Sequence, residues 1–85
     1  MIVGTQFTGS LSPSQSKRWF TFGWPAAWHV VWTVVSTAPL VGAPQLEWDV
    51  AVERASATDI TYWITIRNLS SHAISIEARY AIMNL

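Results

Sequence analysis

The chain has 85 residues, of which 51% are hydrophobic and only 12% charged, and its five basic and five acidic residues give a formal net charge of zero. A neutral chain has no cluster of Lys and Arg to neutralise phosphates, which excludes a nucleic-acid partner, and its hydrophobicity excludes intrinsic disorder. Because the chain has no cysteine, it forms no disulfide and no thiolate metal site. We expect one domain spanning residues 1–85, with no cofactor and no bound metal.

The first half of the chain predicts three strands. Residues 2–11 form the first, in which two glycines indicate bulges or an edge. Residues 17–24 form a shorter aromatic strand. Residues 27–37 (AWHVVWTVVST) consist almost entirely of types that favour strands. Residues 38–44 contain two prolines and a glycine, so we expect a connection there that crosses from one sheet to another.

The second half predicts three further strands, at residues 45–55, 59–69 and 73–83, because apolar and polar residues alternate along each. Short polar linkers at 56–58 and 70–72 are typical of hairpin turns. The last three strands are therefore predicted to be a hairpin-linked antiparallel meander. With the first three strands they predict an all-β fold of about six strands, a small antiparallel β-sandwich or an open barrel.

Hairpin geometry predicts which outward residues of the meander face one another. Centring the first hairpin at residue 57 places Glu47 opposite Arg67. Centring the second at residue 71 places Trp63 opposite Arg79, close to Glu77, which permits a cation–π contact between Arg79 and Trp63. The alternative is an ordinary solvated ladder of charges whose ion pairs contribute little.

The chain has six tryptophans, whose flat apolar rings can stack on sugars or pack in a core or an interface. Alternation places Trp48 in the core, and Trp28 and Trp32 in the core or an interface. Trp63 lies on the polar face of its strand and is the first candidate for binding a ligand. Trp24, beside a glycine and a proline at a strand end, is the second. The predicted ligand site is therefore Trp63, Trp24, Glu77 and Arg79.

The strand at 27–37 is apolar on both faces, although six short strands supply only one thin core. The most direct cover for its second face is another copy of the chain, since an exposed surface of this kind favours aggregation. We expect one face to be buried within the protomer, namely Trp28, Val30, Trp32 and Val34. We expect the other to lie between copies, namely Ala27, His29, Val31, Thr33 and Val35. The alternative is that the two faces are exchanged, because alternation shows that they are opposed and not which one points inward.

Catalytic motifs are absent: the two histidines are isolated, and no nucleophile elbow or phosphate-binding loop occurs, so we expect no enzyme. Prolines interrupt the uncharged segment 19–46, so neither a membrane helix nor a membrane partner is expected. The amino terminus lacks the features of a signal peptide. FTGSL at 7–11 and WFTF at 19–22 resemble the cadence of accessory β-sandwich domains of secreted bacterial proteins, and a secreted or cell-surface location is slightly favoured. Asn68-Leu69-Ser70 matches a glycosylation sequon.

The hypothesis from sequence is a non-catalytic, self-associating β-sandwich module that binds carbohydrate, as a lectin does, through exposed tryptophan. Its partners would be other copies of itself and glycans. The alternative is a structural subunit of a homo-oligomeric ring, shell or filament, in which tryptophans form only contacts between copies. A third hypothesis is a membrane-active or pore-forming protein that acts through the uncharged aromatic segment at 24–32.

Overall fold

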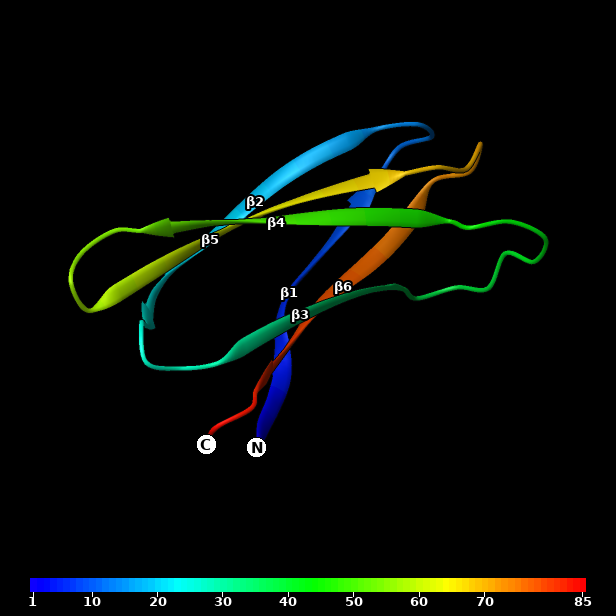
Figure 1. The fold of residues 1–85 in the computed structure, drawn as a ribbon. Coiled ribbons are helices and arrows are strands. Elements are labelled where there is room, and N and C mark those ends of the chain that lie inside the picture. The colour runs from blue at the N-terminus through cyan, green and yellow to red at the C-terminus, as the bar shows by residue number, and fades with distance from the viewer.

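The computed structural model describes all 85 residues and contains six strands and no helix. The strands form two three-stranded antiparallel sheets, with strand orders β1-β6-β3 and β2-β5-β4 (Figure 1). The predicted all-β sandwich is confirmed, and its two sheets are open rather than closed into a barrel. The strands are β1 (Ile2–Leu11), β2 (Ser16–Pro25), β3 (Val30–Ser36), β4 (Leu46–Arg54), β5 (Asp59–Asn68) and β6 (Ile74–Ile82).

Every connection except that between β4 and β5 crosses from one sheet to the other. The predicted crossing at residues 38–44 is confirmed, and so is the hairpin between β4 and β5, in which Glu47 pairs with Arg67. The second hairpin of the predicted meander is wrong, because β6 lies between β1 and β3 in the opposite sheet. A hairpin and a crossing both reverse the chain and keep the same apolar face inward, so alternation cannot distinguish them.

The core lies between the two sheets, where the central strands β5 and β6 supply its most deeply buried residues, Ile64, Ile66, Ile76 and Ala78. Nearer one end of the sandwich, five aromatic rings meet edge to face, with centroids 5.2 to 6.3 Å apart. Such contacts each stabilise a core by ~0.5–1.5 kcal/mol beyond the burial of area. The rings belong to Trp24, Trp28, Trp32, Tyr62 and Tyr80.

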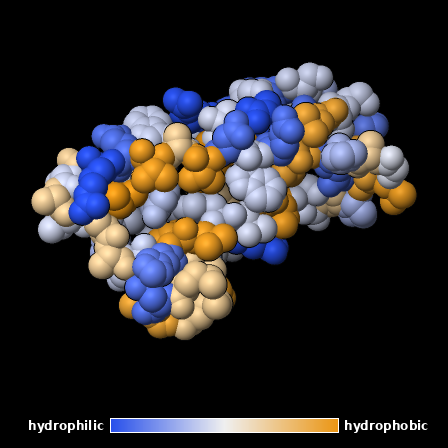
Figure 2. Space-filling model, viewed as in Figure 1, coloured by the Kyte–Doolittle hydropathy of each residue, from blue (hydrophilic) through white to orange (hydrophobic).

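The sandwich is elongated, at 42 × 24 × 17 Å, and only 14 of its 85 residues are buried. A core this thin leaves many apolar side chains at the surface. Figure 2 shows that on one side of the molecule these form several separate patches among polar residues. The structure has no helix long and apolar enough to span a lipid bilayer. The amino and carboxyl termini lie side by side, where the Met1 amino group donates a hydrogen bond to the Leu85 carbonyl (Figure 1).

Candidate functional site

Two β-bulges, one in β1 and one in β2, reverse the inward and outward alternation of side chains at the open edge of the sandwich. In β2 the register shifts between Thr21 and Trp24, where Gly23 has a φ of +80°. Without this extra residue Trp24 would point outward with Phe20, whereas in the structure Trp24 is buried in the aromatic core. A glycine adopts this positive φ without the steric cost that other residues meet.

The bulge in β1 has the same effect on the facing strand. The register shifts between Thr5 and Phe7, so Gln6 is the extra residue and Phe7 turns inward to stack on Trp19 at 5.2 Å. The sequence predicted a bulge or an edge at the glycines. The bulge lies between them, and Gly9 instead makes room for Trp19, whose Cζ2 would lie 2.8 Å from a Cβ at that position.

A groove of about 360 Å³ runs between the two bulged edges. At this edge the Nε2 of Gln6 donates a hydrogen bond across the sandwich to the Oγ1 of Thr21, at 3.0 Å. The same oxygen accepts a hydrogen bond from the Nε1 of Trp24, also at 3.0 Å. Thr21 therefore joins the β1 bulge to the buried aromatic cluster. The groove is lined by Gln6, Phe7, Trp19, Phe20, Thr21 and Phe22.

The groove continues onto the outer face of β2-β5-β4 through three aromatic rings. Phe20 stacks on Trp63 with ring centroids 5.0 Å apart and on Phe22 with centroids 6.3 Å apart. Phe20 is 58% exposed and Phe22 is 75% exposed, which is unusual for side chains of this size. We call the five residues Phe7, Trp19, Phe20, Phe22 and Trp63 the aromatic surface.

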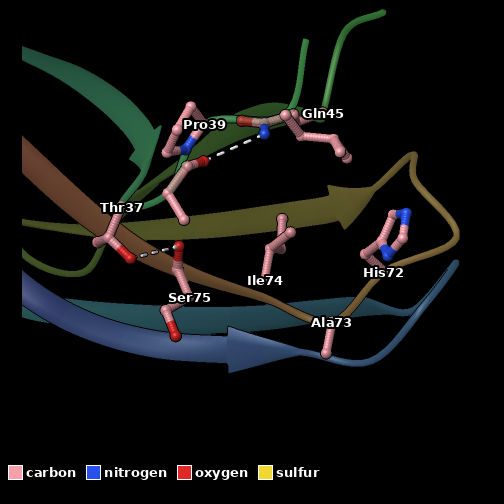
Figure 3. A pocket seen from close by; sticks show the side chains of 9 residues that line it. Thr37, Pro39, Gln45, His72, Ala73, Ile74 and Ser75 are labelled. Carbon is pink, nitrogen blue, oxygen red and sulfur yellow. Dashed lines mark hydrogen bonds between the residues drawn. The ribbon is translucent and has the colours of Figure 1, made fainter.

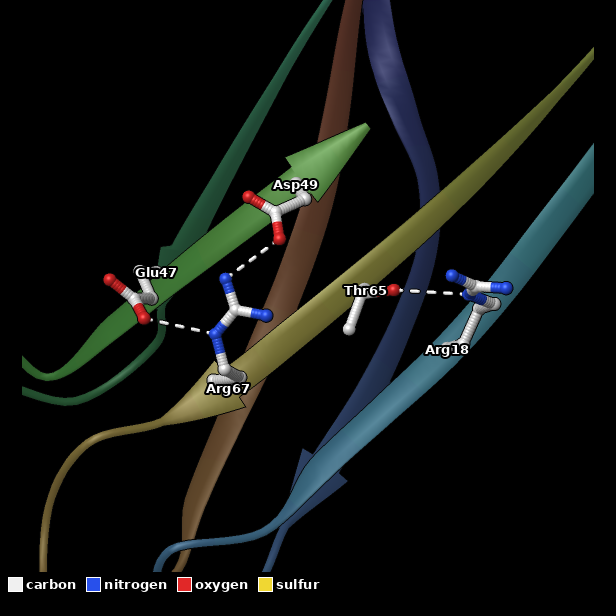
Figure 4. Close-up of polar contacts among 5 residues, drawn as sticks. All are labelled: Arg18, Glu47, Asp49, Thr65 and Arg67. Carbon is white, nitrogen blue, oxygen red and sulfur yellow. Dashed lines mark hydrogen bonds and ion pairs between the residues drawn. The ribbon is translucent and has the colours of Figure 1, made fainter. Parts of the chain in front are cut away.

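Polar groups border the aromatic surface at Trp63. The Nε1 of Trp63 donates a hydrogen bond to the Oε1 of Glu53 at 2.8 Å. The guanidinium of Arg18 lies 5.9 Å from the ring of Trp63, while its Nε donates to the Oγ1 of Thr65 at 3.1 Å (Figure 4). A cation over a ring in this way fixes the ring and leaves donors free at the edge of the surface.

Farther along the same face, Arg67 bridges two carboxylates of β4. Its Nη2 lies 2.8 Å from Asp49 and its Nε lies 2.9 Å from Glu47 (Figure 4). Hydrogen bonds to Asp49 and then to Glu47 raise the pKa of the Arg67 guanidinium above its usual value. The Arg67 side chain is about one third exposed, and the two carboxylates are more than half exposed. Ion pairs that are exposed to this extent contribute little to stability.

The structure does not bring the predicted ligand-site residues together. Trp63 lies on the outer face of β2-β5-β4, whereas Arg79 and Glu77 lie on β6 in the other sheet, where they form an ion pair at 3.0 Å. The predicted contact between Arg79 and Trp63 is therefore wrong, because β6 does not pair with β5, and Arg18 takes that place. Trp24 is buried, because the bulge turns it inward, and does not belong to the site.

The predicted interface residues lie at or near the outer face of β3. Val31, Thr33 and Val35 point outward, with Val31 51% exposed, and Trp32 and Val34 are buried, so the direction of the two faces is as expected. His29 lies outside the strand, which begins at Val30. The reason is that residues 26–28 form a turn closed by a hydrogen bond from the Trp28 N–H to the Pro25 carbonyl.

A second hollow, of about 340 Å³, lies between the β3–β4 and β5–β6 connections (Figure 3). Two of its polar side chains are already used within the chain: Gln45 Nε2 donates to the Ala38 carbonyl, and Thr37 Oγ1 donates to the Ser75 carbonyl. His72 is the only ionisable residue that lines it. A hollow with few free donors and one isolated histidine is a weaker candidate than the aromatic surface.

No family model, no curated protein and no solved structure matches the chain significantly. Function must therefore be argued from the site. No three His, Asp or Glu side chains lie close enough together to hold a metal ion. Asn68, in the sequon, is 2% exposed, and its Nδ2 donates to the carbonyls of Ser12 and His72. A glycan on that nitrogen is incompatible with this structure.

Sequence reasoning missed Phe20, Phe22 and Phe7 as members of the site. In residues 17–24 strict alternation groups Phe20 and Phe22 with Trp24 on the more aromatic face, which gives no reason to place the two phenylalanines outside. One signal was available in the pair Phe22-Gly23, because a glycine within a strand often marks a bulge. That bulge is the feature that separates the outward phenylalanines from the inward Trp24.

Proposed function

We propose that the protein is a non-catalytic carbohydrate-binding module whose ligand lies along the aromatic surface. The observation that supports this proposal is the stack of Phe22, Phe20 and Trp63 on one sheet face, continuous with the groove at Phe7 and Trp19. Sugar rings have apolar faces that pack on aromatic rings and hydroxyl groups that need polar partners at the border. Arg18, Glu53 and Gln6 provide donors and acceptors at that border.

The charge of this face disfavours other ligand classes. Glu47, Asp49 and Glu53 lie on the same face as the aromatic surface and repel a phosphate backbone. The surface is also open, which suits an extended polymer better than a small molecule that needs to be enclosed. An open surface does not exclude water from a reacting bond, in keeping with a role in binding rather than catalysis.

A glycan array followed by affinity electrophoresis with soluble polysaccharides tests the proposal. We expect the wild type to bind at least one glycan, and Phe20→Ala to weaken that binding at least ~10-fold, as removal of a central aromatic anchor does. Trp63→Phe keeps an aromatic ring but loses the N–H that holds the Glu53 carboxylate, so it separates stacking on the ligand from the placement of Glu53.

Val52→Ala is the matched control, because Val52 is an exposed apolar residue of β4 in the same sheet that lies outside the aromatic surface. We expect it to bind as the wild type does. The proposal fails if no glycan binds the wild type, or if Phe20→Ala binds as well as Val52→Ala.

A structural subunit is the second candidate. The observation that favours it is the outer face of β1-β6-β3, where Val3 and Val31 are exposed on a sheet with few charges. If every copy makes contacts only with other copies, no glycan binds the wild type, and Thr33→Glu on this face alters assembly whereas Phe20→Ala does not.

A further inference from the structure

The two outer faces of the sandwich differ sharply in charge. On β1-β6-β3 the only charged outward residues are Glu77 and Arg79, both on the central strand. The other outward positions hold valine, threonine, serine and alanine. The outer face of β2-β5-β4 instead has six charged residues, namely Arg18, Glu47, Asp49, Glu53, Asp59 and Arg67.

The face of β1-β6-β3 presents no aromatic side chain and no long apolar one, and a shallow hollow of about 440 Å³ lies in it beside Val3 and Thr33. Val3 is 68% exposed and Val31 is 51% exposed, on the two edge strands on either side of Ala81. Small and β-branched side chains on a pleated surface allow two sheets to pack face to face at a spacing of ~10 Å. The face combines exposed valines with threonine and serine and one ion pair, a composition that suits a contact between copies that forms and dissociates.

We propose that this face packs against the same face of a second copy of the chain, giving a dimer with four layers of sheet. The charges support a second copy as the occupant. Glu77 and Arg79 are two residues apart, and a twofold axis that crosses the strands at the level of Ala78 places Arg79 of each copy opposite Glu77 of the other. One acidic and one basic residue on either side of the axis make the face its own electrostatic complement.

The size of the face sets the strength of the contact. A sheet of three strands and about nine residues is ~30 Å long and ~14 Å wide, so two faces cover on the order of 800 Å². This area is about two thirds of the ~1,200 Å² at which stable specific interfaces begin, which places the contact among weak, transient ones. We therefore expect a reversible dimer that forms at tens of micromolar protein.

The dimer has a consequence for the aromatic surface. With β1-β6-β3 inside, the β2-β5-β4 sheets become the two outermost layers and point in opposite directions. A dimer would then hold two glycan chains at once, with a gain from linked sites that needs no new contact. This consequence rests on the proposed function, whereas the dimer itself does not.

Sedimentation velocity from about 5 to 500 µM tests the dimer, with charge variants that distinguish an isologous face from other contacts. We expect Arg79→Glu and Glu77→Arg each to weaken dimerisation at least ~10-fold, because like charges then oppose one another across the axis. The double variant E77R/R79E exchanges the two charges and is expected to restore the dimer. Thr33→Glu, which leaves the ion pair intact, is expected to weaken it as well.

Arg18→Glu is the matched control, because it makes the same change of net charge as Arg79→Glu on the opposite outer face. We expect it to dimerise as the wild type does, and circular dichroism to show every variant folded, since these side chains are exposed or partly exposed. The proposal is overturned if the wild type is monomeric at 500 µM, or if Arg18→Glu weakens association as much as Arg79→Glu. It is also overturned if the double variant stays as weak as the single ones. If all variants associate as the wild type does, the contact lies outside this face, for example at a strand edge, and the proposal is overturned.

Discussion

Replacing Thr21 with valine removes one oxygen that two donors share. Valine has the same branched shape, so the packing is kept while Gln6 Nε2 and Trp24 Nε1 both lose their acceptor. The Trp24 ring is buried, and an unpaired buried donor costs ~1–3 kcal/mol. The partly buried Gln6 bond adds ~0.5–1.5 kcal/mol. We expect Thr21→Val to lower the free energy of unfolding by ~2–4 kcal/mol, a large part of the ~4–13 kcal/mol typical of a chain of this length.

Urea unfolding followed by circular dichroism measures this loss, and the slope of the transition shows whether the unfolded state has changed. Thr61→Val is the matched control: Thr61 is 6% exposed and Thr21 is 8% exposed, but the Thr61 hydroxyl reaches solvent and forms no hydrogen bond within the chain. We expect the control to change stability by less than ~0.5 kcal/mol. Equal losses in the two variants would refute the argument, because both would then reflect only the loss of a hydroxyl.

Three further predictions concern a buried asparagine, a glycine and a tyrosine. Asn68→Asp places a carboxylate against the carbonyls of Ser12 and His72, so we expect a loss of ~2–4 kcal/mol at neutral pH in urea unfolding, and a smaller loss at low pH as the carboxyl is protonated. Gly23→Ala meets no atom within 4 Å but must adopt a φ of +80°, so thermal unfolding is expected to show a loss of ~1 kcal/mol. Burial raises the pKa of the Tyr62 hydroxyl above its usual 10.0, so its contribution to stability is complete below pH 10.0 and is lost as the pH rises through the folded pKa. We expect the Tm of the wild type to fall as the pH rises above 10.0. A similar fall in Tyr62→Phe would show that Tyr62 is not the group responsible.

The sequence predicts the strands and their faces well, because alternation depends only on which side of a strand meets the core. It also predicts the pairing of Glu47 with Arg67, since a short turn fixes the register of a hairpin. The sequence does not predict that the chain passes to the other sheet after β5. A hairpin within one sheet and a crossing between sheets both reverse the chain and leave the same local pattern of residues. The inward position of Asn68 at the end of an apolar face is the one clue, since a buried amide there bonds the carbonyls of two crossing loops.

The candidate site is harder to predict because it depends on two departures from alternation. A single extra residue at Gln6 and another at Phe22-Gly23 exchange the inside and the outside for the rest of each strand. Phe7 and Trp24 turn inward for this reason, and Phe20 stays outside. Their placement follows from backbone geometry at the open edge and not from alternation, which would keep Phe20 and Trp24 on the same face.

The arrangement of the connections also determines how the chain can fold. Only β4 and β5 are neighbours both in sequence and in a sheet, whereas β1 pairs with β6 across almost the whole length of the chain. A long loop loses entropy before any contact compensates for the loss, and this slows folding. Local hairpins, by contrast, form within microseconds. The β4–β5 hairpin is therefore the natural nucleus. The strand at the amino terminus stays without a partner until β6 has been synthesised, so the sandwich forms only after β6 has left the ribosome.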